Sequence, residues 1–194
     1  MTPAFSICVY CGSRPGSLAA YADAARSVGE WIGQHGGQLV YGGGRNGLMG
    51  VVADATLASG GSVVGIIPHA LVEKEWAHQN CTELLVVDTM HERKRLMAER
   101  ADAFLALPGG IGTFEEFFEV WTWRQLGYHG KPVGLLNVEH VYDGLLNFLG
   151  SIVEQQFIND WQMSLITVSA DPHALLQTLV TEAGMTAAPR LDQI

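Results

Sequence analysis

The sequence has few cysteines, no long hydrophobic run and no recognisable export segment. Only three cysteines occur among 194 residues, and an odd number of cysteines favours reduced thiols over a disulfide framework. No apolar segment approaches the roughly 20 residues that a membrane-spanning helix requires, and the N-terminus lacks the pattern of a signal peptide. We therefore expect a cytoplasmic protein without a membrane as partner.

Positive charge is also scarce. The chain has 11 basic and 20 acidic residues, which gives a formal net charge of −9. A nucleic acid or an anionic membrane would be repelled by such a chain overall, so neither is expected as a partner. A small molecule is the expected ligand.

Metal and redox motifs are weak. The seven histidines do not have the spacing of zinc ligands, so we expect no bound metal. Cys8 and Cys11 form a C-x-x-C pair, but Cys8 lies in the strand-like segment 5–10, where an odd spacing sends the two side chains to opposite faces. We therefore expect no redox chemistry at this pair.

The sequence does contain a regular alternation of short apolar segments with amphipathic ones. Strands are expected at residues 5–10, 38–41, 62–67, 83–87, 103–107, 131–138 and 165–168, and helices at 18–35, 48–59, 91–100, from about 113, at 141–155 and at 172–182. This alternation predicts an α/β fold, a Rossmann-like three-layer sandwich with a mainly parallel sheet and helices on both faces.

The length and the hydrophobic content of 48% fit a single domain, 1–194. Residues 69–81 break the periodicity and are expected to form a loop over the strand ends. The segment from Gly184 to Ile194 has no apolar pattern and is expected to be a mobile tail.

Three of the expected strands lead into glycine-rich turns, after Tyr10, Tyr41 and Leu107. The carboxyl ends of parallel strands lie at one edge of a sheet, so the three turns should meet there. The third turn, residues 108–113, precedes a helix whose unpaired N–H groups would face it, which favours a phosphate as ligand. Because this turn matches neither the dinucleotide fingerprint nor the Walker motif, no nucleotide cofactor is implied.

Two carboxylates, Glu115 and Glu116, are expected in the first turn of that helix. Thr113 and Glu116 have the spacing of a capping box, in which both side chains bind N–H groups at the helix start. The alternative is that a carboxylate beside an anion site is catalytic. Local chemistry alone leaves both interpretations open.

The segment 90–97 holds the densest positive charge, with Arg93, Lys94 and Arg95. These side chains could be a solvated helix face paired with Glu92 and Glu99. From local chemistry the solvated face is favoured, and the alternative is that they supply the counter-charge that a phosphate-bearing substrate needs.

Several motifs recur together along nearly the whole chain. They are Cys11-Gly12-Ser13, Tyr41-Gly42-Gly43-Gly44, Gly47-Leu48-Met49-Gly50, Ile67-Pro68 followed by Glu75, Met90-His91-x-Arg93-Lys94, Pro108-Gly109-Gly110-x-Gly112-Thr113-x-x-Glu116, Thr122-Trp123-x-Gln125-Leu126-Gly127 and Lys131-Pro132-Val133. With these motifs the sequence strongly resembles the LONELY GUY (LOG) family of cytokinin-activating phosphoribohydrolases, also known by the older label of possible lysine decarboxylases.

The resemblance implies hydrolysis of the N-glycosidic bond of nucleoside 5′-monophosphates, without a cofactor. It implies that Arg93 and Glu116 are the catalytic pair. The substrate contacts that it implies are these two residues with Gly12, Ser13, Gly43, Glu75, Lys94, Gly110, Ile111, Gly112, Thr113, Phe114, Glu115 and Thr122. One departure is Arg14, where many relatives have a second Ser.

The resemblance also implies a homodimer. The aromatic residues Phe117, Phe118, Trp121 and Trp123 suggest that it is built partly on the central helix, unless these rings belong to the core. Light scattering separates the two states.

The residue types agree with the implied reaction. Cleavage of a base from ribose passes through an oxocarbenium-like state, so Glu116 could stabilise positive charge or activate water. Arg93 cannot act as a base at neutral pH, and it should orient Glu116 or the ribose, or bind phosphate. AMP and N6-modified AMP are the expected substrates, with the 5′-phosphate required.

Two other functions compete with hydrolysis. One is a nucleotide-binding module without turnover, which the same glycine turns could serve. The other is a pyridoxal-phosphate lysine decarboxylase, which requires a Schiff-base lysine. The chain has only Lys74, Lys94 and Lys131, and none has a supporting constellation.

Overall fold

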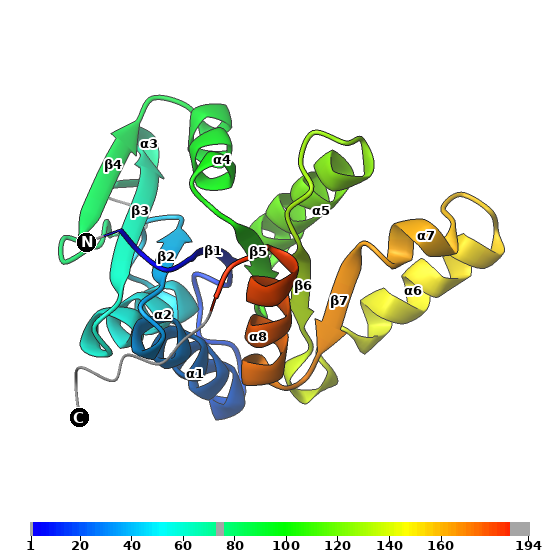
Figure 1. The fold of residues 1–194 in the computed structure, drawn as a ribbon, viewed down its shortest axis with the longest axis horizontal. Coiled ribbons are helices and arrows are strands. Elements are labelled where there is room, and N and C mark those ends of the chain that lie inside the picture. The colour runs from blue at the N-terminus through cyan, green and yellow to red at the C-terminus, as the bar shows by residue number, and fades with distance from the viewer. Residues whose placement is uncertain (1, 73–75, 187–194) are drawn as a thin grey trace.

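The computed structural model describes residues 2–72 and 76–186, and it is built around one seven-stranded sheet (Figure 1). The strands are β1 (Ser6–Tyr10), β2 (Gln38–Tyr41), β3 (Ser62–Pro68), β4 (Glu83–Val87), β5 (Ala103–Ala106), β6 (Val133–Leu136) and β7 (Ile166–Ser169). Each neighbouring pair is parallel, in the order β4-β3-β2-β1-β5-β6-β7.

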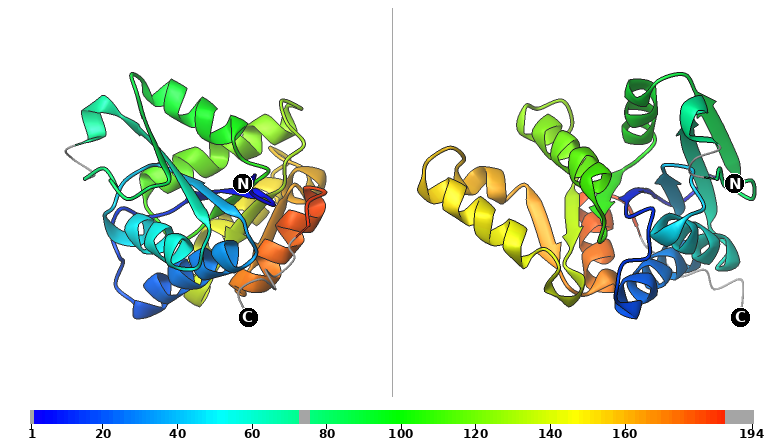
Figure 2. Two further views of the ribbon diagram at one scale, coloured as in Figure 1. Left: turned by 60° about the vertical axis from the view of Figure 1, so that its left-hand side comes forward. Right: turned by 180° about the vertical axis from the view of Figure 1, so that it is seen from behind.

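Helices cover both faces of this sheet (Figure 2). They are α1 (Ala19–Gln34), α2 (Gly47–Ala58), α3 (His69–Val72), α4 (Met90–Glu99), α5 (Ile111–Gln125), α6 (Asp143–Glu154), α7 (Asp160–Met163) and α8 (Pro172–Glu182). One hydrophobic core joins the sheet to α1, α2 and α8, and a second joins it to α4, α5 and α6. The predicted α/β three-layer architecture is confirmed.

The order of the strands creates a switch point between β1 and β5. From β1 the chain proceeds outward through β2 and β3 to the edge strand β4, and then returns to place β5 on the other side of β1. The helices that follow β1 and β5 therefore lie on opposite faces, as right-handed crossovers require. Ligands of open α/β sheets bind outside the carboxyl ends of the strands at such a point.

The strands near this point are almost completely buried, which explains their continuous apolar sequences. Cys8 belongs to one hydrophobic core and Cys11 to the other, so the prediction that their side chains take opposite faces is confirmed. Burial raises the pKa of both thiols, which disfavours the reactive thiolate.

Two predicted segments were wrong. The segment 69–81 was expected to be a loop throughout, but His69–Val72 forms the helical turn α3, with Leu71 and Val72 half-buried. The strand expected at 131–138 is only the four residues of β6, and a 3₁₀ turn, Val138–His140, follows it. Glu139 and His140 have φ values of 49° and 59°, a left-handed backbone that cannot continue a strand.

Residues 187–194, most of the segment expected to be a mobile tail, lie outside the described residues. Within the described ranges, no helix is both long enough and apolar enough to cross a membrane. No group of three or more His, Cys, Asp or Glu side chains there could hold a metal ion.

Candidate active site

A cavity of about 470 Å³ lies at the carboxyl ends of the central strands, beside the switch point. It is lined by Cys11, Ser13, Arg14, Met49, Arg93, Gly110, Ile111, Gly112, Thr113 and Glu116. Two hydrogen bonds of 3.0 Å join the loops around it: the amide of Gly12 donates to the carbonyl of Pro108, and the amide of Leu48 donates to the carbonyl of Gly12. The predicted meeting of the glycine turns is confirmed.

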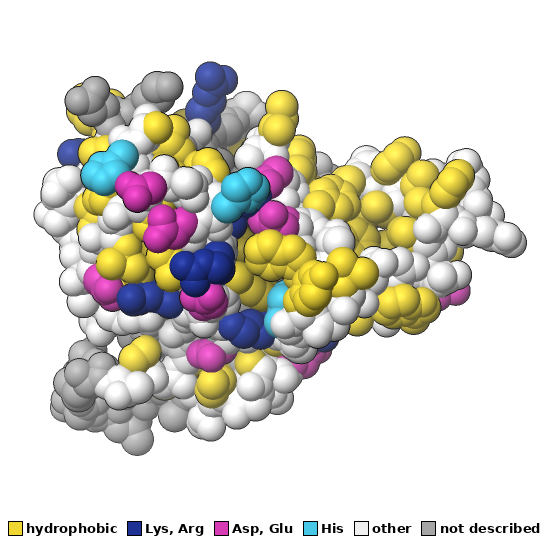
Figure 3. All heavy atoms as spheres, turned by 90° about the horizontal axis from the view of Figure 1, so that it is seen from above, with side chains coloured by type: hydrophobic (Ala, Val, Ile, Leu, Met, Phe, Trp, Pro, Cys, Tyr) yellow, Lys and Arg dark blue, Asp and Glu magenta, His cyan; other side chains and the backbone are white. Residues whose placement is uncertain are grey.

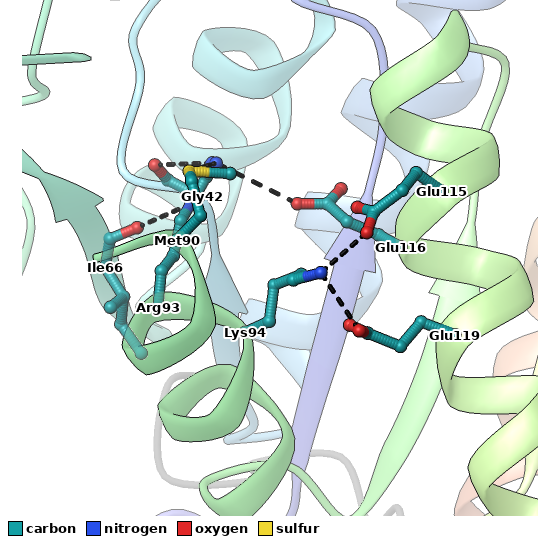
Figure 4. A network of polar contacts seen from close by, with 8 residues as sticks. All are labelled: Gly42, Ile66, Met90, Arg93, Lys94, Glu115, Glu116 and Glu119. Carbon is teal, nitrogen blue, oxygen red and sulfur yellow. Dashed lines mark hydrogen bonds and ion pairs between the residues drawn. The ribbon is translucent and has the colours of Figure 1, made fainter. Parts of the chain in front are cut away.

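Arg93 is the buried cation of this cavity, with only 5% of its surface exposed. It comes from the first turn of α4 and extends toward the ends of β2 and β3. Its Nε donates to the carbonyl of Ile66 and its Nη2 donates to the carbonyl of Gly42, both at 3.1 Å (Figure 4). A guanidinium held by two backbone carbonyls keeps a fixed direction, so the surface interpretation of Arg93 was wrong.

Gly42 is matched to this guanidinium. A Cβ atom on Gly42 would collide with Nη2 of Arg93, so any other residue at this position would displace the guanidinium. The absence of a side chain at Gly42 therefore leaves room for the guanidinium of Arg93. The sequence alone did not reveal that these two residues are in contact.

Glu116 faces Arg93 across the cavity. Its Oε1 lies 4.0 Å from Nη1 of Arg93, and 13% of its side-chain surface is exposed. The preceding residue, Glu115, also extends toward α4, but its Oε1 accepts a hydrogen bond of 2.6 Å from Nζ of Lys94 (Figure 4). Of the two adjacent carboxylates, only Glu116 lines the cavity.

Lys94 does not line this cavity. Its Nζ donates to Glu115 and, at 2.9 Å, to Glu119, and only 10% of its side chain is exposed. Burial alone would lower the pKa of Lys94, but the hydrogen bonds to the two carboxylates outweigh it and leave the pKa raised. Lys94 thus links α4 to α5, and its predicted contact with substrate remains a prediction.

The first turn of α5 forms another wall of the cavity. The helix begins at Ile111, with Gly110 as its N-cap and no side chain capping it. Thr113 is therefore the third helical residue, and Glu116 lies beyond the first turn, so both the capping box and the first-turn position of the carboxylates were wrong. Because Gly110 adopts an extended conformation, the helix starts earlier than the capping box required, and its first three residues line the cavity. The N–H groups at a helix start have no partner within the helix.

A family model described as "Possible lysine decarboxylase" matches residues 49–179, which include Arg93 and the start of α5. The chain is 46% identical over 173 residues to cytokinin riboside 5′-monophosphate phosphoribohydrolase LOG2 of Arabidopsis thaliana, a match that covers 89% of this chain and 81% of that protein. The chain belongs to the LOG family. It is also 52% identical over 152 residues to the phosphoribohydrolase LOG of Oryza sativa subsp. japonica, which covers 78% of this chain and 63% of the relative.

Solved structures outside the close relatives share the fold. The molybdenum cofactor binding protein of Rippkaea orientalis matches with a TM-score of 0.69 at 18% identity, over 93% of this chain and 97% of that one. The DNA processing protein A of Helicobacter pylori matches with a TM-score of 0.60 at 12% identity, over 93% and 82%. At 18% and 12% sequence identity, these matches show only that the fold is shared.

The remaining residues predicted from the LOG-family motifs either do not line the cavity or lie outside the described residues. Gly12 and Gly43 lie in the loops that follow β1 and β2, and Phe114 packs its ring against Tyr142. Thr122 is an exposed residue of α5 that does not line the cavity. Glu75 lies outside the described residues.

Three residues that line this LOG-family cavity were not singled out from the sequence as ligand contacts: Cys11, Arg14 and Met49. Cys11 and Met49 occur in the motifs that carry the resemblance, yet they look like core residues because they are apolar. Arg14 was noted in the sequence as a departure from the family pattern, but it was not predicted to contact the ligand.

Proposed function

We propose that this chain hydrolyses the N-glycosidic bond of nucleoside 5′-monophosphates and releases the free base and ribose 5-phosphate. The observation that carries the proposal is the placement of Glu116, held against a buried arginine, in the same cavity as an open helix start. The relatives named as cytokinin riboside 5′-monophosphate phosphoribohydrolases support the same reaction.

The 5′-phosphate binds at the start of α5. Free N–H groups and the positive end of the helix dipole favour an anion there, and Gly110 and Gly112 have open space where other residues carry Cβ atoms. From Gly112 to Glu116 the helix rises about 6 Å, at 1.5 Å per residue. That rise is comparable to the span from the 5′-phosphate to the anomeric carbon of a ribose.

Glu116 acts at the anomeric carbon. As the bond to the base breaks, positive charge develops on the ribose ring, and a carboxylate facing the sugar stabilises it or activates the attacking water. Arg93 orients this carboxylate, because the direction of its guanidinium is fixed by hydrogen bonds to the carbonyls of Ile66 and Gly42.

The decarboxylase alternative is not favoured. A pyridoxal-phosphate enzyme requires an amine that is free to form a Schiff base. Lys94 is bound by two carboxylates, and Nζ of Lys131 donates to the carbonyl of Ala98 at 2.7 Å. Neither of these two described lysines lines the cavity.

Base release tests the proposal directly. We expect free adenine from AMP and free base from isopentenyladenosine monophosphate, and more than tenfold slower release from the two unphosphorylated nucleosides, since each charge-assisted hydrogen bond to phosphate contributes about 1.5–3 kcal/mol. Chromatography at equal substrate concentrations measures this. Binding of AMP without base release would leave only a nucleotide-binding module.

Gly112→Ala refines this test. The new Cβ would enter open space in the phosphate site, so we expect weaker AMP binding in a protein that melts at or above the wild-type temperature, because Ala favours a helix by about 1 kcal/mol over Gly. Gly150→Ala in α6 is the matched control, since its Cβ also meets open space but far along the chain from the cavity. Unchanged AMP affinity in Gly112→Ala would place the phosphate elsewhere.

We further propose a homodimer. Phe117 and Trp121, suggested as interface residues, are buried in the core instead, and Phe118 and Trp123 pack partly against it. Large exposed hydrophobic side chains gather where α5 ends and over α6 and α7 (Figure 3). They are Leu126, Tyr128, Phe148, Phe157 and Trp161.

Light scattering should therefore give about twice the chain mass of 21.0 kDa. Phe148→Asp should shift the protein toward the monomer, because a charge would be buried in the apolar interface. Val86→Asp, an exposed position on the edge strand β4 at the opposite side of the sheet, should leave the mass unchanged. A single-chain mass for the wild type across micromolar concentrations contradicts the dimer.

The proposed compartment is the cytoplasm. It is supported by the three free cysteines, Cys8, Cys11 and Cys81, because reduced thiols persist in the reducing compartments of the cell.

A further inference from the structure

Arg14 lies in the first glycine loop, after β1, and lines the cavity together with the start of α5. It also lines a smaller, mainly apolar cavity of about 170 Å³ formed with Pro15, Tyr21 and Leu48, so the residue borders both cavities. Within residues 2–72 and 76–186, no hydrogen bond or ion pair engages its guanidinium. The residue is exposed, and its five N–H donors remain available to a ligand.

The charged side chains around the main cavity compensate one another, with the exception of Arg14. Arg93 and Glu116 face each other and cancel in formal charge, whereas the charge of Lys94 is outweighed by Glu115 and Glu119. A phosphate monoester carries about −1.5 to −2 charges at pH 7. Among the described lining residues, Arg14 is the cation without an acidic partner.

The backbone of Arg14 is held in place. Gly47 packs so closely beneath it that a Cβ atom there would collide with the amide nitrogen of Arg14, and Gly12 lies against its carbonyl. The hydrogen bond from the amide of Leu48 to the carbonyl of Gly12 fixes the same loop. An arginine on a fixed loop loses less conformational freedom on binding than one on a mobile loop.

We propose that Arg14 binds the 5′-phosphate of the substrate and sets the preference of this chain for phosphorylated over unphosphorylated nucleosides. The proposal rests on the proposed function for the identity of the substrate. It assigns Arg14 to ligand binding and leaves the cleavage of the glycosidic bond to Glu116.

The test uses ribose 5-phosphate and ribose as probes in titration calorimetry, and AMP in the base-release assay. Arg14→Gln should weaken ribose 5-phosphate binding and raise KM for AMP by about 10- to 100-fold, the loss of one charge-assisted contact, with kcat nearly unchanged. Arg14→Lys should restore part of the affinity, because it restores the charge but not the planar fork. Arg26→Gln removes the same charge from an exposed surface position on α1 and should change nothing.

The outcomes separate the two proposals. If Arg14→Gln binds ribose 5-phosphate within twofold of the wild type, or if the wild type binds ribose 5-phosphate no better than ribose, the role of Arg14 is overturned. If the wild type binds ribose 5-phosphate but releases no base from AMP, the proposed hydrolysis fails while the calorimetry still decides the role of Arg14.

Discussion

Glu116→Gln should lower kcat for base release from AMP by about 10²- to 10⁴-fold, the usual contribution of a positioned acid or base, and leave AMP binding largely intact. The amide keeps the shape of the carboxylate but loses the negative charge that stabilises the oxocarbenium-like state. The phosphate site at the start of α5 is unchanged by this substitution. Chromatography of released adenine gives the rate, and calorimetry with AMP gives the affinity.

Glu119→Gln is the matched control, because it makes the same substitution one turn further along α5, at a residue that pairs with Lys94 outside the cavity. We expect it to keep most of the wild-type rate. Turnover of Glu116→Gln above about a tenth of wild type would show that the carboxylate is not the group that acts on the sugar.

Gly42→Ala should reduce kcat/KM for AMP by about 10²-fold, the penalty that a displacement of about 1 Å in a catalytic group can cause. The added methyl group takes the place of Nη2 of Arg93, so the guanidinium must leave the Gly42 carbonyl and turn away from Glu116. The variant tests the orientation of Arg93 without deleting its charge. The base-release assay over a range of AMP concentrations measures the effect.

Gly130→Ala controls for the loss of a loop glycine, because a Cβ at that position meets open space. The melting temperatures of both variants should stay near that of the wild type, since the collision at Gly42 involves the end of one side chain. Wild-type kcat/KM in Gly42→Ala would mean that catalysis does not depend on where the guanidinium of Arg93 lies.

Much of the fold could be predicted because the strands are buried on both faces. Segments such as Ser6–Tyr10 and Ala103–Ala106 are continuous apolar runs, and each is followed by a glycine turn that ends it. The wrong predictions concern segments that lack such an apolar run. A single apolar helical turn at His69–Val72 resembles a loop in sequence, and the left-handed residues after β6 have no compositional signature.

The site could be predicted only in part. The motifs indicated Arg93 and Glu116, but local chemistry did not distinguish Glu116 from Glu115, because their directions depend on where α5 begins. That start at Ile111 follows from the extended backbone of Gly110, which permits several conformations. The separation of Arg93 from Lys94 depends in turn on how α4 packs between β3 and α5, a long-range contact that no local pattern records.

The pairing of β1 with β5 has a consequence for how the protein acquires its cavity during folding. Ile7 pairs with Ala103, and Ser6 and Asp102 are joined by a hydrogen bond across 96 residues of chain. Ser13, Met49 and Arg93 lie within the stretch of chain that this contact closes, and Glu116 follows it. Contacts of such sequence separation form slowly, because the entropy of closing the loop must be overcome before they stabilise the chain. A nascent or refolding chain can thus form its first four strands before β5 and α5 bring Glu116 to the cavity.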